Sequence, residues 1–240
     1  DLYVSRQDPQ RASVFASLQD GFYRNLEHDY PAALAAARQA LRLHRNAATL
    51  SAVARNLRSL GRSAEAVDAL TEALAIVEEP RQLYAAQLWR SLVQALLESG
   101  AAGRAKEEAE RFANAAGRAA PEFRAWAYLA QSDLRFAEGA YPQALDLLEA
   151  ARRDGLDDWT LTAQLLSALL VSLRELPYPQ VTALATSMGD RFRGLPVSLP
   201  AWARQVIQTR QLLAGDVSEV FRQLSSQLDA AGGARERAPI

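Results

Sequence analysis

The residues that most often carry out chemistry are few in this sequence. It has two histidines, His28 and His44, and no cysteine. A zinc site needs several His, Cys or carboxylate ligands at short spacings, and neither histidine has a second histidine or a cysteine at such a spacing. Both histidines fall at expected turns or helix ends, so no Ser/His/Asp set can be assembled around them. The sequence therefore predicts no metal site and no catalytic residues.

Two further stretches are superficially similar to chemical motifs. The segment Gly100-Ala-Ala-Gly-Arg-Ala-Lys106 lacks the glycine that precedes the lysine of a phosphate loop, and Glu107 stands where that loop has Ser or Thr. A helix rather than a strand is also expected before it. The pair Asp157-Asp158 predicts a helix N-cap with a favourable dipole interaction rather than a catalytic carboxylate pair. We expect no cofactor and no enzymatic activity.

The composition is that of a folded chain without a charged or membrane-spanning segment. Of 240 residues, 49% are hydrophobic and 23% charged, and the net charge is −1. Basic and acidic residues are balanced in both halves, which argues against a nucleic-acid partner, and no run of apolar residues is long enough to insert into a membrane. The absence of cysteine fits the cytoplasm and leaves the periplasm as an alternative.

Two features of the sequence concern its source and extent. Lys106 is the only lysine among 27 basic residues, and alanine and leucine abound, a usage typical of GC-rich bacterial genomes. Because the sequence begins at Asp1 rather than Met, we expect an excised domain or a processed product.

Hydrophobic spacing and turn residues predict helices throughout and no strands. Apolar residues recur at helical intervals, as in Val14, Phe15, Leu18, Phe22 and Leu26, and glycine or proline marks the breaks. No stretch alternates apolar and polar residues with β-branched enrichment. The predicted helix pairs form one all-α domain over residues 1–230, followed by a disordered tail, 231–240. The six pairs cover roughly 11–45, 47–79, 82–118, 122–155, 158–194 and 199–230.

The turns of these pairs recur with a period in the thirties. Residues 24–34 and 135–145 share Arg, Glu, Tyr, Pro, Ala and Leu at matching positions. The turn positions Tyr30, Ser63, Ala102, Tyr141, Tyr178 and Val217 lie 33, 39, 39, 37 and 39 residues apart. Three residues after each comes a small or β-branched residue, so Ala66, Ala105 and Ala144 are expected to be buried at close helix contacts.

A period of this length with two helices per unit resembles the tetratricopeptide repeat. The residues that match the pattern of this repeat are Leu50, Val53, Ala54, Leu57, Gly61, Ala66 and Leu70 in unit two; Trp89, Leu92, Gly100 and Ala105 in unit three; and Trp126, Leu129, Ala130, Gly139, Tyr141, Ala144 and Ala151 in unit four. Units five and six match mainly at the turn. The resemblance implies a right-handed α-solenoid of about six helix-turn-helix units, with the aromatic residues as core wedges.

The register of the first unit depends on how long its turn is. Without an extended turn Arg24 would occupy a buried position, and burying an unpaired guanidinium is costly. A longer turn instead places Phe22 inside, and the same choice places Asp133 inside in unit four.

The resemblance also implies which residues contact a ligand, because in that family the first helices line the concave face. The corresponding positions are Tyr23, Arg24, Arg55, Arg58, Arg90, Gln94, Gln131 and Arg135. Four units would present an arginine, which suits recognition of carboxylates. The alternatives are that these arginines are solvated or paired with nearby Glu and Asp, or that an apolar groove uses Tyr23, Leu97 and Leu134.

The function implied is a non-enzymatic scaffold whose concave groove binds a protein or peptide, with an acidic segment as the candidate partner. Two alternatives stay open: a ligand- or peptide-sensing module of a bacterial transcriptional regulator, and a cell-envelope assembly or secretion scaffold. The sequence does not identify the partner or the oligomeric state.

Overall fold

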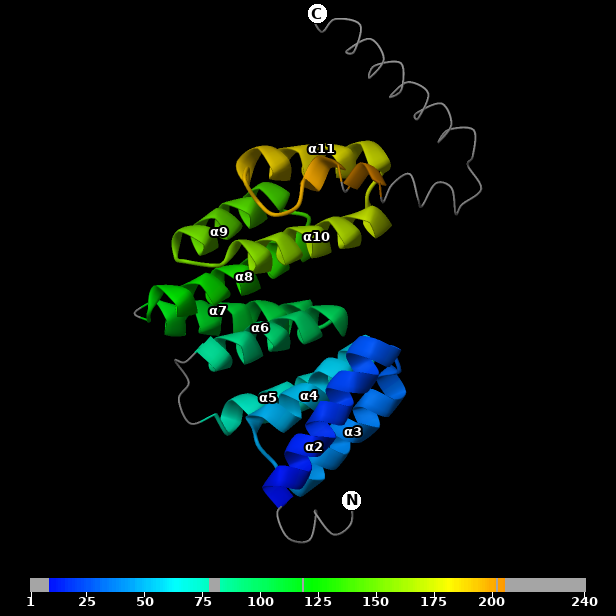
Figure 1. Ribbon diagram of the computed structural model, residues 1–240. Coiled ribbons are helices and arrows are strands. Elements are labelled where there is room, and N and C mark those ends of the chain that lie inside the picture. The colour runs from blue at the N-terminus through cyan, green and yellow to red at the C-terminus, as the bar shows by residue number, and fades with distance from the viewer. Residues whose placement is uncertain (1–8, 78–82, 118, 202, 206–240) are drawn as a thin grey trace, which may run out of the picture. The chain divides into compact units, whose positions relative to one another are not determined.

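The computed structural model describes residues 9–77, 83–117, 119–201 and 203–205. All regular secondary structure within these ranges is helical, which confirms the all-α class (Figure 1). The chain divides into two compact units, residues 1–156 and residues 157–240.

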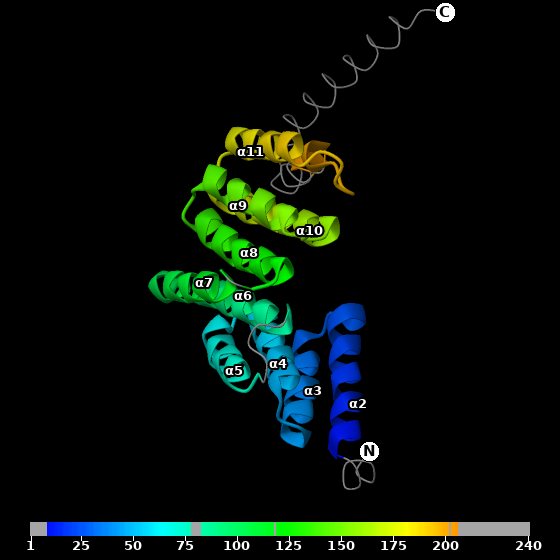
Figure 2. The same ribbon diagram turned by 90° about the vertical axis from the view of Figure 1, so that its left-hand side faces the viewer.

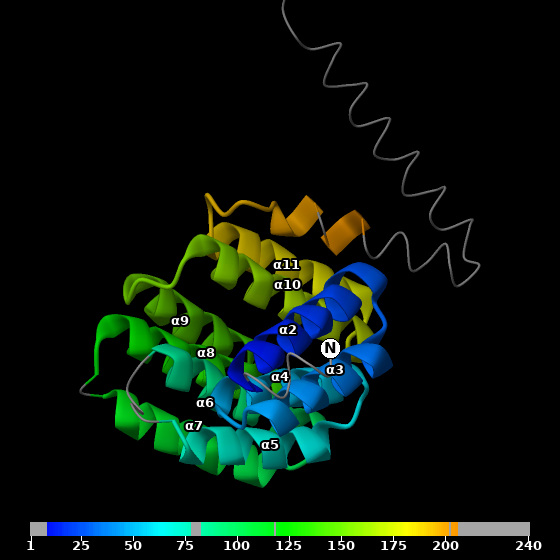
Figure 3. The ribbon, with the colours of Figure 1, turned by 60° about the horizontal axis from the view of Figure 1, so that its bottom comes forward.

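The first unit consists of helices that pack against one another in chain order, as Figures 1 and 2 show. Its helices are α2 (Pro9–Phe22), the π-helical turn η1 (Tyr23–Glu27), α3 (Tyr30–Leu43), α4 (Ala47–Ser59), α5 (Ser63–Ala75), α6 (Leu83–Glu98), α7 (Ala102–Ala116), α8 (Pro121–Ala137) and α9 (Tyr141–Arg153). In Figure 3, α5 and α7 lie on the lower side of α4 and α6, their partners in the second and third pairs. We call α4, α6 and α8 the first helices of their pairs.

The second unit contains the fifth pair, α10 (Asp158–Glu175) and α11 (Tyr178–Arg191), which pack against each other. Residues 199–201 and 203–205 are helical as well. The rest of the predicted sixth pair and the tail from residue 231 lie outside the described residues. Gly189 of α11 lies where an added Cβ would meet the Pro200 ring at 2.6 Å, so a glycine is required for this close approach.

The helix boundaries follow from local chemistry. Pro31, Pro121 and Pro142 stand in first turns, where a missing N–H has no intrahelical partner to lose. Asp157 caps α10 by accepting a hydrogen bond from the Thr160 N–H at 2.8 Å, as predicted. That contact, together with the Thr160 hydroxyl, lowers the pKa of the Asp157 carboxyl.

In the first unit, each turn inside a pair needs a residue with a left-handed backbone conformation, two positions before the second helix begins. Glycine supplies it after α6, where Gly100 has φ of 79°. In the first pair His28 takes this place with φ of 55°, and it is the one non-glycine residue with positive φ in the described chain. His28 therefore has a structural role in the turn, the role that glycine has in the other turns of this unit.

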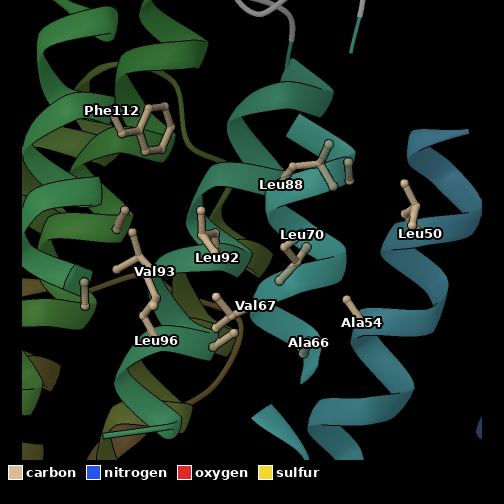
Figure 4. Packing of buried hydrophobic residues seen from close by; sticks show 14 of the residues in the cluster. Leu50, Ala54, Ala66, Val67, Leu70, Leu88, Leu92, Val93, Leu96 and Phe112 are labelled. Atoms are coloured by element: carbon tan, nitrogen blue, oxygen red, sulfur yellow. The ribbon is translucent and has the colours of Figure 1, made fainter. Parts of the chain in front are cut away.

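The core of the first unit is built from leucines and alanines at the helix contacts. Figure 4 shows such residues of α4, α5 and α6 pointing into the space between the three helices, with α5 in the middle. Phe112 of α7 is fully buried, stacked on Trp89 at a centroid distance of 5.2 Å and edge-on to Phe123 at 5.3 Å. Trp89 and Trp126, predicted as wedges, are half-buried against this core.

The small-residue position after each turn is confirmed as a site of close helix approach. Ala66, Ala105 and Ala144 are each 0% exposed. Their methyl groups lie where a larger side chain would push two helices apart.

The regularly spaced apolar residues of α2 do not form its buried side, and the predicted burial of Phe22 is wrong. Val14, Leu18 and Phe22 lie on the exposed side of the helix, and Phe22 is 47% exposed. The buried side of α2 instead carries small and polar residues, including Ser13, whose hydroxyl donates to the Ala40 carbonyl of α3 at 3.1 Å. The chain accommodates its extra residues in the π-helical turn Tyr23–Glu27, which follows α2 directly, and not by lengthening the loop.

A paired substitution in α5 tests this packing. Ala66→Leu should lower the free energy of unfolding by about 1–3 kcal/mol, because the added methylenes have no space at the helix contact. Ala64→Leu, an identical change at an exposed position of the same helix, should stay within about 0.5 kcal/mol. Chemical denaturation of both variants measures the difference, and equal stabilities would show that the assigned helix register is wrong.

Candidate functional site

A cavity of about 220 Å³ lies between two successive first helices, and we call it the α4–α6 cavity. It is lined by Ser51, Ala54, Arg55 and Arg58 of α4, Leu70 of α5, and Tyr84, Gln87, Leu88 and Ser91 of α6. On each first helix these positions recur at intervals of three and four residues, which places them on one face. The cavity thus lies on the side of the helices from which the resemblance predicted ligand contacts.

The cavity has an apolar floor and unused hydrogen-bonding groups. Leu70 and Leu88 are almost fully buried beneath it. The Tyr84 hydroxyl is buried without a hydrogen bond of regular geometry, and the Gln87 amide makes none to the described chain. Burial raises the pKa of Tyr84, against the opposing effects of the nearby Ser51 hydroxyl and Arg55 charge, so the phenol stays protonated and able to donate at neutral pH.

Arg58 is occupied by a carboxylate one repeat further along the chain. Its Nε and Nη2 donate to the two oxygens of Glu98 at 2.9 and 2.6 Å, and the Ser63 hydroxyl donates to the same carboxylate at 2.9 Å. Burial alone would raise the pKa of Glu98, but the hydrogen bonds from Arg58 and Ser63 and the charge of Arg58 lower it overall. Arg58 therefore lines the cavity as half of an ion pair.

Arg90 and Gln94 contact α8 instead of the cavity. Both donate to Oδ2 of Asp133 at 2.9 Å, and the side chains of Arg90 and Asp133 are only 14% and 8% exposed. The guanidinium also lies 5.7 Å from the centroid of the Trp126 ring. Asp133 is thus inside, as the longer-turn register predicted, and Arg90 and Gln94 supply the partners that a buried carboxylate requires.

Gln131 and Arg135 point to a different region of the first unit. They line a separate cavity of about 310 Å³ with residues of α7 and α9, among them Lys106, Glu110 and Asp146. Arg135 pairs with Glu138 at 2.6 Å, three residues away on the same surface. On α8 they lie roughly opposite Trp126 and Asp133. These two residues do not share a site with Arg55.

Arg24 and Arg55 differ from the other predicted arginines in having little carboxylate contact. Arg55 is 49% exposed, and its Nη2 lies 3.9 Å from Oδ2 of the buried Asp20. Asp20 is already bound by the Asn56 amide. The Nε of Arg24, in the π-helical turn, is buried and makes no hydrogen bond. Tyr23 beside it is half-buried, in edge contact with Phe22 at 5.6 Å.

The eight predicted contact residues are therefore distributed over several places rather than along one ladder. Of the five arginines, Arg58, Arg90 and Arg135 make close ion pairs within the chain. Ser51, Tyr84, Gln87 and Ser91 line the α4–α6 cavity without having been predicted. Their signal was available in the sequence, since residues 51, 55 and 58 and residues 84, 87 and 91 repeat the same helical spacing.

Two kinds of feature are absent from the part of the chain that the structure describes. Within ranges 9–77, 83–117, 119–201 and 203–205, no three His, Cys, Asp or Glu side chains gather as metal ligands would. In the same ranges no helix has the length and apolar character needed to cross a bilayer.

Comparisons with known proteins identify the fold but match no protein family. No family model and no curated protein matches the sequence. Among solved structures, the chain is similar to a Rap protein in complex with competence and sporulation factor, at 15% identity and a TM-score of 0.54. The match covers 94% of this chain and 73% of the Rap chain. At this identity it shows the fold alone, a helical repeat similar to the tetratricopeptide repeat.

The Arg90–Asp133 pair gives a test of which arginines are structural. Asp133→Ala should lower the free energy of unfolding by about 3–5 kcal/mol, because it leaves a buried guanidinium without its carboxylate. The combined change Arg90→Met and Asp133→Leu should recover most of that loss. As a control, Glu138→Ala breaks the exposed pair with Arg135 and should cost no more than about 1 kcal/mol. If thermal unfolding shows equal effects for Asp133→Ala and Glu138→Ala, the structural role of Arg90 is disproved.

Proposed function

We propose that residues 1–156 bind a protein or peptide segment at the α4–α6 cavity and catalyse no reaction. The observation that carries the proposal is the lining of this cavity, in which Tyr84 and Gln87 hold unused hydrogen-bonding groups above the apolar Leu70 and Leu88. A polypeptide needs partners for its backbone groups and an apolar surface for its side chains, and this lining offers both.

The comparison with Rap supports a ligand-binding role. A chain of the same fold was solved in complex with competence and sporulation factor, so helical repeats of this kind can hold a bound molecule. The tetratricopeptide pattern in units two to four supports the same use of the first helices, because that family binds its partners on their exposed face. On this basis we assign the protein to the peptide-binding scaffolds, with the sensory module of a bacterial regulator as the alternative.

The arrangement of the reactive side chains supports a role without catalysis. Ser51 and Ser91 line the cavity, but neither histidine is among the lining residues. His28 holds a turn and His44 follows the end of α3, and both are exposed. A serine nucleophile without a neighbouring base is not activated.

The proposal is tested by selecting ligands and mapping where they bind. A random peptide library is displayed and selected against the whole chain, and the selected peptides are titrated by fluorescence anisotropy. Ser51→Trp should fill the cavity and weaken binding at least tenfold, because the indole occupies the space of the ligand. Ser59→Trp, on the same helix but exposed and outside the lining, should leave binding unchanged.

Circular dichroism and thermal unfolding confirm that both variants fold. Peptides that bind Ser51→Trp as tightly as the unmodified chain would overturn the proposal, because their site would lie elsewhere. Failure to select any peptide would overturn it as well.

A further inference from the structure

The end of the α4–α6 cavity nearest to α2 holds more positive than negative charge. Asp20 is buried, with a side chain only 4% exposed, and it accepts a hydrogen bond from the Asn56 amide. Arg55 lies 3.9 Å from this carboxylate, and the charge of Arg24 acts on Arg55. Because Arg58 is neutralised by Glu98, the group as a whole keeps an excess of one positive charge.

The two guanidinium groups are close enough to affect each other. Burial, followed by the like charge of Arg24, lowers the pKa of Arg55, and the attraction of Asp20 opposes this. Arginine nevertheless stays charged in proteins, so the repulsion persists in the unliganded chain. A bound anion would relieve it.

Several donors near this end have no acceptor. The Tyr84 hydroxyl lines the cavity on the α6 side and makes no hydrogen bond of regular geometry, although the Ser51 hydroxyl is near it. The Nε of Arg24, outside the cavity lining, is buried and makes no hydrogen bond. The contact between Arg55 and Asp20 is long, at 3.9 Å, which leaves the guanidinium able to donate elsewhere. Buried donors without partners are costly, and an acceptor that enters the cavity would satisfy those that line it.

The π-helical turn explains how Arg24 reaches this place. After Phe22 the backbone changes from α-helical to π-helical over Tyr23–Glu27, which alters the angular position of every side chain that follows. Arg24 lies in this segment with its Nε buried, and its charge acts on Arg55. Short π-helical segments are frequent at functional sites, and here the segment supplies the second cation of the pair.

We infer that Arg55 and the Tyr84 hydroxyl form the carboxylate-binding end of the α4–α6 cavity, with the charge of Arg24 adding to that of Arg55, and that this end receives a carboxylate of the bound peptide. The inference rests on the proposed function and names the chemistry of its ligand. A single negative charge matches the excess of one positive charge, whereas a phosphate dianion would exceed it. The cavity, with Ala54 and Leu88 in its lining, has room for the methylene groups of an acidic side chain.

Small capped amino acids test the inference directly, because they carry the carboxylate without the rest of a partner. The probes are N-acetylglutamate N-methylamide, its neutral glutamine analogue, and N-acetylalanine, which carries only a terminal carboxylate. Each is titrated into the whole chain while the arginine Nε–Hε signals are followed by NMR. The glutamate probe should shift the Arg24 and Arg55 signals and bind at least tenfold more tightly than the glutamine probe.

The second carboxylate probe identifies the source of the ligand group. Tighter binding of the glutamate probe assigns the site to an acidic side chain, and tighter binding of N-acetylalanine assigns it to a chain terminus. Either result supports a carboxylate site. Affinity should fall as salt rises, because exposed charges are screened beyond roughly 10 Å at 0.1 M salt.

Substitutions test whether the glutamate probe binds at Arg55. Arg55→Gln should weaken the glutamate probe at least tenfold, while Arg62→Gln, an exposed arginine paired with Glu65 at the start of α5, should leave it unchanged. If Arg55→Gln fails to fold because Asp20 loses a cation, Tyr84→Phe provides the test, with a severalfold loss expected. Equal binding of the glutamate and glutamine probes, or tighter binding of inorganic phosphate, would overturn the inference.

The two proposals fail in different ways. Selected peptides that require the cavity but ignore Arg55→Gln would overturn the carboxylate inference alone. Glutamate binding at Arg55, combined with selected peptides that tolerate Ser51→Trp, would overturn the proposed function alone.

Discussion

The structure of the first unit depends on the close approach of two helices at each turn. An alanine in the first turn of each second helix is fully buried, and its small side chain sets the distance to the preceding first helix. A helix pair cannot bury its apolar side alone, so each pair must also pack against the next. The exposed positions of α4 and α6 then fall side by side, and the α4–α6 cavity forms between them. The proposed binding surface is therefore a consequence of the repeat.

The polar side chains of the first helices serve two purposes. Arg58 and Arg90 bind carboxylates from neighbouring helices and hold adjacent repeats together. Arg90 and Asp133 are buried enough that each needs the other, which makes the pair a constraint on how α6 and α8 can pack. Arg55 lies near one buried carboxylate, Asp20, that is already bound by Asn56, and the charge of Arg24 acts on Arg55. In our proposal, the positive charge left over at this end of the cavity distinguishes a recognition surface from an internal contact.

Much of the fold could be predicted from the sequence, but less of the site. Prolines in first turns and glycines before second helices are local signals, and they placed the helices from α3 to α11 within a few residues. The ion pairs are not local, because Arg58 and Glu98 lie 40 residues apart and Arg90 and Asp133 lie 43 apart. Such a separation is close to one repeat, so pairing each arginine with a carboxylate one period later would have found them. The π-helical turn after Phe22 has no comparable signal in the sequence. The interior of α2 was mispredicted because its regularly spaced apolar residues Val14, Leu18 and Phe22 are exposed.

The central claim is that the first-helix arginines are divided into those bound within the chain and those available to a ligand. Hydrogen exchange of the arginine Nε–Hε groups, measured by NMR on the unliganded chain, tests it directly. Arg90 should exchange much more slowly than the exposed Arg111, because its Nε–H is buried and donates to Asp133, while Arg55 should exchange almost as fast as Arg111. Protection of Arg55 equal to that of Arg90 would contradict the account, because no arginine of the α4–α6 cavity would then be available to a ligand.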